Sequence, residues 1–238
     1  MILVLSGEGI SDIGGMSGGN FRPGPMAMFI DKLIVPIANY SLLGIQAFEF
    51  ISEGELGRLS KKLPMAISIG KKRDYETAYF FKNARALARQ AKGRAHEQKC
   101  PIGAVLFRDA DSTERRVHES KWNSIEGGVL AEEFAYGVPM APKPKSEAWL
   151  LCALKPQAYQ NCADLENSLS GNDNSPNPAK DQLEKILTAQ NKAVSHLVEM
   201  VEDGTIVPGR IEMPSFQRFR DRLEHVARSL LGLPHSAI

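Results

Sequence analysis

The chain has 238 residues, 43% of them hydrophobic and 24% charged, with a formal net charge of +1. These values are typical of a folded globular protein with one large domain, or with a core domain and a helical appendage, and they exclude a highly charged disordered chain. No run approaches about 18 consecutive apolar residues, and the short N-terminal apolar run lacks the preceding charges of a signal peptide. We therefore expect a cytoplasmic protein that does not span a membrane.

The chain contains three cysteines, Cys100, Cys152 and Cys162. Their odd number and wide spacing, without a CxxC pair, argue against a disulfide framework and against a zinc knuckle. We therefore predict reduced cysteines, with Cys152 as a buried apolar side chain between two apolar neighbours.

The first 145 residues predict an alternation of strands and helices. Residues 2–6 form a continuously apolar run, as expected for a strand covered on both faces, and a glycine-rich loop follows at 14–19. We expect further strands or extended pieces at 47–51, 63–69, 102–107 and 138–141, and helices at 26–40, 74–97 and 124–136. Pro36 is expected to end or kink the first helix, and Gly137 follows the last. Buried strands joined through helices imply a mostly parallel central sheet flanked by helices, an α/β fold.

After residue 145 the pattern becomes helical. Ser146 is suited to be the N-cap of a helix that contains Trp149. A loop rich in Ser, Asn and Pro covers 166–179. Further helices are expected at 179–203 and 215–231. The predicted organisation is an α/β core at 1–145 with a helical C-terminal part at 146–238 that packs on it.

Acidic side chains follow two of the predicted buried strands. Glu8 comes after the first strand, with a glycine on each side, and Asp109 and Asp111 come after the strand at 102–107. Ligands and metals collect at the carboxyl ends of strands in open α/β sheets. Carboxylates are the ligands that Mg²⁺ and Mn²⁺ prefer, and the scattered His and Cys residues disfavour zinc. The pattern predicts a hard-cation site for phosphoryl-transfer chemistry.

These motifs resemble the topoisomerase–primase (TOPRIM) family, in which a glutamate after the first strand acts as general acid or base and a later DxD pair binds magnesium. The segments 142–150 and 177–180 look like those of small bacterial TOPRIM-like proteins encoded beside ABC-type ATPases in anti-phage defence loci, similar to overcoming-lysogenization-defect nucleases. The resemblance covers about 1–185. It implies an insertion around 47–100 between Glu8 and Asp109.

The resemblance implies a set of site residues. It gives catalytic roles to Glu8, Asp109, Asp111 and Glu147, and metal-binding roles to Glu8, Asp12, Asp109 and Asp111. Asp12 is alternatively a helix cap, and Glu147 alternatively favours the dipole of its helix. Lys143 and Lys145 are candidates to neutralise a substrate phosphate, or are simply solvated.

Basic residues recur along 71–99, in a stripe that either tracks a nucleic-acid backbone or is a solvated helix face. A dinucleotide-binding glycine motif is excluded because Asp12 replaces its last glycine, where a carboxylate would repel a pyrophosphate. No P-loop motif occurs, which excludes a P-loop ATPase.

Two functions follow as hypotheses. The first is a Mg²⁺-dependent (or Mn²⁺-dependent) nuclease of TOPRIM type that acts on DNA or RNA as an effector of anti-phage defence. The second is a non-catalytic regulatory or binding subunit of an ABC-type ATPase complex. Ser112, Thr113 and Glu114 stand where the family has a glycine after the DxD pair, which motivates the second hypothesis. Homo-oligomerisation remains open under both.

Overall fold

The computed structural model describes residues 1–64 and 75–235. Its centre is a parallel sheet with the strand order β4-β1-β5-β6, made of β1 (Ile2–Gly7), β4 (Phe48–Phe50), β5 (Ile102–Phe107) and β6 (Gly137–Met140). Leu5 of β1 pairs with Phe50 on one side and with Val105 on the other. The predicted α/β class, with a mostly parallel sheet flanked by helices, is confirmed.

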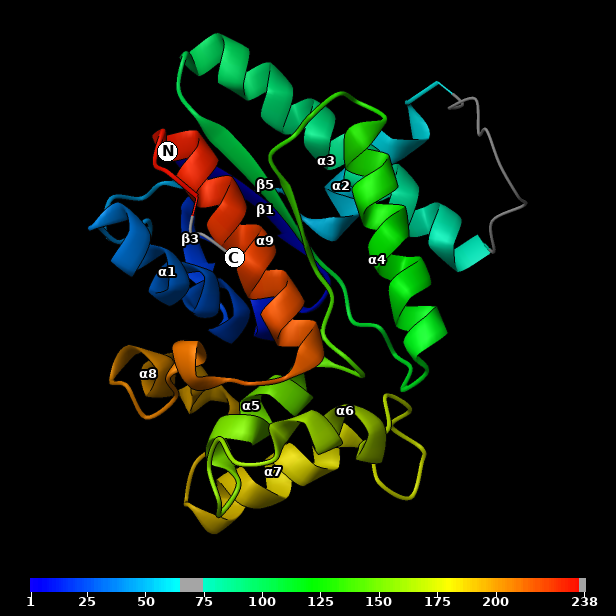
Figure 1. Cartoon of the computed structure of the whole chain (residues 1–238), viewed down its shortest axis with the longest axis vertical. Helices are drawn as coiled ribbons and strands as arrows, with labels where there is room; N and C mark the ends of the chain where they lie inside the picture. The colour runs from blue at the N-terminus through cyan, green and yellow to red at the C-terminus, as the bar shows by residue number, and fades with distance from the viewer. Residues whose placement is uncertain (65–74, 236–238) are drawn as a thin grey trace.

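Helices cover both faces of this sheet (Figure 1). On one face lie α1 (Pro25–Ala38) and α9 (Pro214–Leu231), and on the other α2 (Glu53–Lys61), α3 (Tyr75–Gln98) and α4 (Arg115–Leu130). Alternate residues of β1 enter two separate buried clusters: Leu3 and Leu5 join α1 and α9, whereas Val4 joins α2, α3 and α4. Side chains on both faces are buried because successive strand residues point to opposite faces.

The C-terminal helices lie beyond the carboxyl ends of the strands (Figure 1). They are α5 (Ser146–Leu154), α6 (Leu165–Ser168), α7 (Ala179–Ala189) and α8 (Leu197–Glu202), joined by the short helices η2 (Cys162–Asp164), η3 (Val194–His196) and η4 (Pro208–Arg210). Trp149 of α5 is fully buried, and its ring centroid lies 4.9 Å from that of Phe216 and 5.7 Å from that of Phe219, both on α9. Its Nε1 donates a hydrogen bond to Ser215 Oγ at 2.9 Å. These contacts tie α5 to the helix that covers the sheet.

The glycine-rich segment is more ordered than the predicted loop. The π-helix η1 (Gly9–Ile13) follows β1, and then an antiparallel hairpin forms from β2 (Gly14–Ser17) and β3 (Asn20–Pro23). Gly18 and Gly19 make its turn with φ values of 58° and 82°, which a glycine adopts at no steric cost. The glycines therefore serve a tight hairpin turn.

Several predicted helix bounds are wrong. Helix α4 begins at Arg115 rather than near 124, because its polar first turns carry no apolar pattern from which the start could be predicted. Gly137 begins β6 instead of following a helix. The helix predicted over 179–203 is interrupted between α7 and η3, and Lys145 rather than Ser146 is the N-cap of α5. Of the extended piece predicted at 63–69, residues 65–69 lie outside the described residues, as does Asp74 at the start of the predicted helix 74–97.

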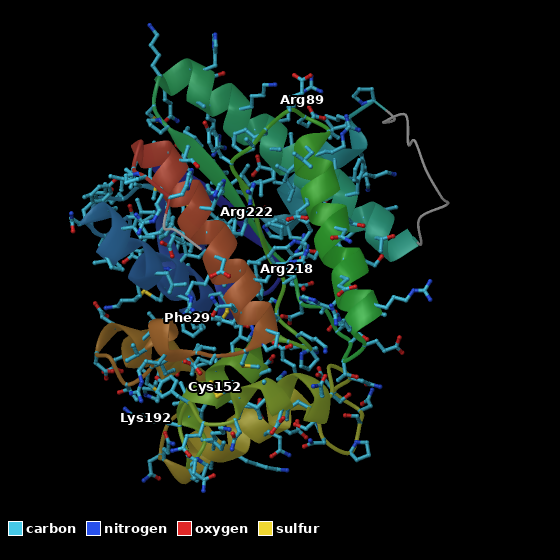
Figure 2. All side chains as sticks on the ribbon, viewed as in Figure 1. Phe29, Arg89, Cys152, Lys192, Arg218 and Arg222 are labelled. Carbon is cyan, nitrogen blue, oxygen red and sulfur yellow. A yellow bond between two sulfur atoms is a disulfide. The ribbon has the colours of Figure 1, made fainter. Side chains whose placement is uncertain are left out.

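The prediction of reduced cysteines is also wrong for one pair. Cys152 and Cys162 form a disulfide, which links the C-terminal end of α5 to η2, and Cys152 is labelled there in Figure 2. The chain returns on itself between them, since Tyr159 N donates a hydrogen bond to Cys152 O at 2.7 Å. This local return brought together two cysteines ten residues apart, whose spacing alone gave no signal. No helix among the described residues is both long and apolar enough to cross a membrane.

Candidate metal centre

The parallel pairing of β1 with β5 brings the two predicted acidic motifs together. Gly7 at the end of β1 pairs with Phe107 at the end of β5, so both strands end at the same edge of the sheet. Glu8 then accepts a hydrogen bond at 2.6 Å from the backbone N–H of Asp109, 101 positions later in the chain. This contact places the two carboxylates beside each other.

Asp12 joins the same site through a tight turn. Gly9 has a φ of 73° and lies so close to the Asp12 carboxylate that a Cβ on Gly9 would collide with it. Ser146 Oγ donates a hydrogen bond to Asp12 Oδ1 at 2.8 Å, and Ser146 N donates one to Asp109 Oδ1 at 3.0 Å. The first residue of α5 therefore holds both aspartates in place.

Asp111 is exposed, with a left-handed φ of 52°, and its backbone N–H donates to Pro144 O at 2.8 Å. Lys145 Nζ lies 3.7 Å from Asp111 Oδ1 and 2.9 Å from Asp173 Oδ1. Asp173 is within reach because the loop that carries it packs against the backbone of Asp111, where a Cβ on Gly171 would lie 2.8 Å from Asp111 Cα. Lys145 thus connects the DxD pair to the loop before α7.

The electrostatics show several carboxylates that repel one another. Burial raises the pKa of Asp109 well above its ordinary value, and the negative charges of Glu147, Glu8, Asp12 and Asp111 raise it further. Burial also raises the pKa of Glu8, against the lowering effects of its hydrogen bond from Asp109 and of the nearby Arg108 charge. In the folded protein Asp109 and Glu8 therefore hold their protons to a higher pH than free carboxyl groups do.

Glu147 belongs to this centre. Burial raises its pKa, the charge of Asp12 adds to that, and its own backbone N–H and Lys145 oppose the rise. Lys145 itself has a raised pKa: burial lowers it, but the hydrogen bond to Asp173 and the charge of Asp111 outweigh that effect. The ammonium group therefore stays charged beside the carboxylates.

Lys143 does not reach the carboxylates. Its side chain is buried, and its Nζ donates a hydrogen bond to Asn167 Oδ1 at 3.1 Å. Of the two predicted phosphate-binding lysines, the structure places only Lys145 at the centre.

A pocket of about 230 Å³ opens beside the site, lined by Asp12, Asp109 and Glu147 together with Lys145. Lys180, in the first turn of α7, lines its other side. Acidic and basic groups therefore face one cavity, an arrangement suited to a phosphate group and a cation bound together.

Sequence reasoning missed two contributors to this site and assigned a different role to a third. Asp173 lies in a Ser/Asn/Pro-rich loop with no local pattern that distinguishes it, and only the tertiary packing of that loop brings it to Lys145. Arg108, beside Asp109, is 1% exposed and influences Glu8, yet a lone arginine at a strand end gives no signal. Ser146 was expected as a helix cap, whereas its hydroxyl and its N–H bind aspartates.

The donor set fits a hard divalent cation in its chemistry, because it offers carboxylate oxygens. Within residues 1–64 and 75–235, no three of these groups already converge as a complete ligand set. Their mutual repulsion favours side-chain positions that are apart, and a divalent cation would reverse that repulsion.

The basic stripe predicted along 71–99 is partly used for packing. Arg85 forms an ion pair with Glu132 at 2.7 Å and Arg94 one with Glu49 at 2.5 Å, whereas Arg89, labelled in Figure 2, is exposed. The described part of the stripe is therefore not a continuous set of unpaired cations.

No family model matches the chain, and no curated protein sequence and no solved structure matches it either. The TOPRIM resemblance therefore rests on the motifs of the sequence alone.

Proposed function

We propose that the protein is a Mg²⁺-dependent (or Mn²⁺-dependent) nuclease of TOPRIM type, which hydrolyses phosphodiester bonds. The observation that carries this proposal is the contact of Glu8 with the backbone N–H of Asp109 at the carboxyl ends of two neighbouring parallel strands, where burial and the charges of Glu147, Glu8, Asp12 and Asp111 raise the pKa of Asp109. A site that concentrates carboxylates in this way is suited to a divalent cation and a phosphate.

Glu8, Asp109 and Asp111 would hold the cation, with Asp12 and Glu147 beside them. A bound magnesium ion neutralises phosphate charge and makes a bound water more acidic. Lys145 and Lys180 carry positive charge at the same pocket, so they can orient a phosphate and stabilise the charge that develops on its oxygens. Glu8, whose pKa is raised by burial, is a stronger base than an ordinary carboxylate and is suited to accept a proton.

A second candidate is a non-catalytic regulatory or binding subunit of an ABC-type ATPase complex. It is favoured by the absence of three converged ligands among the described residues, and by Ser112, Thr113 and Glu114 in place of a glycine after the DxD pair. A role in anti-phage defence, with such an ATPase as partner, rests on the family resemblance under both proposals.

The test is a cleavage assay with Mg²⁺ or Mn²⁺ on plasmid DNA, single-stranded DNA and tRNA. Glu8→Ala and Asp109→Ala are expected to lower the rate by roughly 10²-fold or more. Glu97→Ala is the control, because it removes an exposed carboxylate near the far end of α3. Cleavage that survives in Asp109→Ala would contradict the nuclease proposal.

Thermal denaturation separates the two candidates. Mg²⁺ should raise the melting temperature of the wild type, and the Asp109→Ala substitution should abolish the rise, because a ligand that binds only the folded state stabilises it. A Mg²⁺-dependent rise without any cleavage would select the non-catalytic subunit. The absence of both a melting-temperature rise and cleavage would contradict the metal site itself.

A further inference from the structure

A second pocket, of about 600 Å³, opens between α2 and α3. We call it the α2–α3 pocket, and its lining includes Gly54, Gly57, Arg58, Lys61, Tyr79 and Lys82. Arg58 and Lys61 lie three positions apart on α2 and therefore on one helix face, opposite Lys82 on α3. All three cationic side chains are exposed, and none has a hydrogen bond or an ion pair with another residue in the described part of the chain. Among the described residues, the pocket thus presents three unpaired positive charges.

The one acidic residue of the lining is already engaged. Glu53 Oε1 accepts a hydrogen bond at 2.9 Å from the Tyr79 hydroxyl and lies 3.4 Å from the buried guanidinium of Arg108. Its charge therefore does little to offset the three cations. Gly54 and Gly57 have open space where a Cβ would stand, so a ligand can approach the backbone of α2 closely.

This pocket lies at the same edge of the sheet as the carboxylate centre. Strand β4 ends at Phe50, which pairs with Leu5 of β1, and α2 begins three residues later. Glu53, which lines this pocket, lies 3.4 Å from the guanidinium of Arg108, and Arg108 directly precedes Asp109 of the carboxylate centre, so the two sites are neighbours. Arg108 is buried between them, and its guanidinium lies 5.6 Å from the centroid of the Tyr79 ring.

We propose that the α2–α3 pocket binds the phosphate backbone of the nucleic-acid substrate on one side of the cleavage position. The inference rests on the proposed nuclease function, which supplies the polyanion. Unpaired Lys and Arg side chains give most of the non-specific affinity for phosphates. Tyr79, 37% exposed beside them, adds an aromatic ring on which a base can stack, and this combination is typical of single-strand binding.

Fluorescence anisotropy of the full chain tests this assignment. The probes are labelled single-stranded DNA, single-stranded RNA and duplex DNA of equal length, titrated at several NaCl concentrations with Ca²⁺ in place of Mg²⁺. The Lys61→Gln/Lys82→Gln variant removes two of the charges. Its matched control is Lys185→Gln/Lys192→Gln, two exposed lysines at the opposite end of the molecule, where Figure 2 labels Lys192.

On a single strand, each phosphate contact contributes about 0.7 to the slope of log affinity against log salt, or roughly fivefold in affinity at 0.1 M salt. The Lys61→Gln/Lys82→Gln variant should therefore lose about 1.4 in slope and roughly 25-fold in affinity, with an unchanged melting temperature. The control variant should bind as the wild type does. The DNA and RNA probes identify which backbone is preferred.

An unchanged slope in Lys61→Gln/Lys82→Gln, or an equal loss in the control variant, would overturn the inference. The inference would also be overturned if Lys61→Gln/Lys82→Gln weakened the affinity for polyglutamate of matched charge as much as the affinity for nucleic acid, because that would indicate an acidic protein partner instead. The two proposals fail independently. If cleavage disappears in Asp109→Ala but binding is unchanged in Lys61→Gln/Lys82→Gln, only the proposed role of the α2–α3 pocket is overturned. If binding through the pocket depends on salt but no cleavage occurs, only the nuclease proposal is overturned.

Discussion

Asp109 has an unfavourable environment for a charged side chain. Burial and the charges of Glu147, Glu8 and Asp12 raise its pKa, and Ser146 N donates the hydrogen bond that its Oδ1 accepts. An acid whose pKa is higher in the folded than in the unfolded state makes its full contribution to stability at low pH, where it is protonated in both states. That contribution is lost as the pH rises through the folded-state pKa. Without a cation, ionised Asp109 is therefore a cost to the folded protein at neutral pH.

Asp109→Asn should consequently stabilise the metal-free protein at neutral pH. The amide keeps an oxygen for the Ser146 N–H but carries no charge, so the gain should grow as the pH rises from about 4 and then level off. Each kcal/mol gained corresponds to about 2–4 °C in melting temperature for a chain of this size. The measurement is thermal denaturation in EDTA between pH 4 and pH 8. A variant that is less stable than the wild type at every pH would contradict the repulsion described at Asp109.

Asp173 is expected to position Lys145. In the proposed nuclease, Lys145→Ala should lower kcat by about 10²-fold, because the proposed phosphate site loses a positive charge. Asp173→Asn should cause a smaller fall, about tenfold, since the ammonium remains but is held less firmly. Steady-state kinetics should show the change in kcat more than in KM, with Lys185→Ala on α7 as the control. Wild-type kinetics in Asp173→Asn would leave the hydrogen bond to Lys145 without a catalytic role.

At the scale of elements, α5 joins the site to the helical part. Its first residues carry Ser146 and Glu147, and its last turn is linked to η2 by the disulfide between Cys152 and Cys162. A crosslink that closes a loop of this length stabilises a protein by about 2–3 kcal/mol in the chain-entropy model. The disulfide therefore fixes the end of the helix opposite to the carboxylates.

The Cys152→Ala/Cys162→Ala variant should melt several degrees below the wild type, at about 2–4 °C for each kcal/mol lost. A reductant should lower the melting temperature of the wild type toward that of the variant and leave the variant unchanged. Cys100→Ser is the control, because Cys100 is a free thiol. Equal sensitivity of the wild type and the double variant to the reductant would show that this disulfide does not contribute.

Sequence patterns predicted β1, β5 and the acids that follow them because each depends on local information. The apolar runs of β1 and β5 and the acids after them are contiguous in the chain, and parallel pairing then brings Glu8 to Asp109. The β2–β3 hairpin, the start of α4 and the disulfide could not be predicted in the same way. They depend on backbone turns and tertiary contacts that leave no periodic trace in the sequence.

At the scale of the whole molecule, α9 connects the sheet to the helices beyond it. Phe216 contacts both Phe29 of α1 and Trp149 of α5, with ring centroids 6.0 Å and 4.9 Å apart. A fully buried phenylalanine replaced by alanine typically costs about 3–5 kcal/mol, a large fraction of a typical total stability of about 5–15 kcal/mol. The core at 1–145 and the helical part at 146–238 should therefore unfold together.

Chemical denaturation followed by two probes tests this cooperativity. In Trp122→Phe, fluorescence reports Trp149 of α5 alone, whereas far-UV circular dichroism reports all helices. The two transitions should coincide, and Phe216→Ala introduced into this background should shift both to lower denaturant by the same amount. Separate transitions would indicate two independently folding domains.

The position of β1 in the sheet has a consequence for biosynthesis. It is a central strand, yet both of its neighbours, β4 and β5, follow it in the chain, and the residues that hold Asp12 and Lys145 come later still. A nascent polypeptide on the ribosome therefore exposes Glu8 early but has no strand on which to build the carboxylate centre until β5 has emerged. The carboxylate centre therefore assembles only late in translation, after β5 and then the residues that contact Asp12 and Lys145 have left the ribosome.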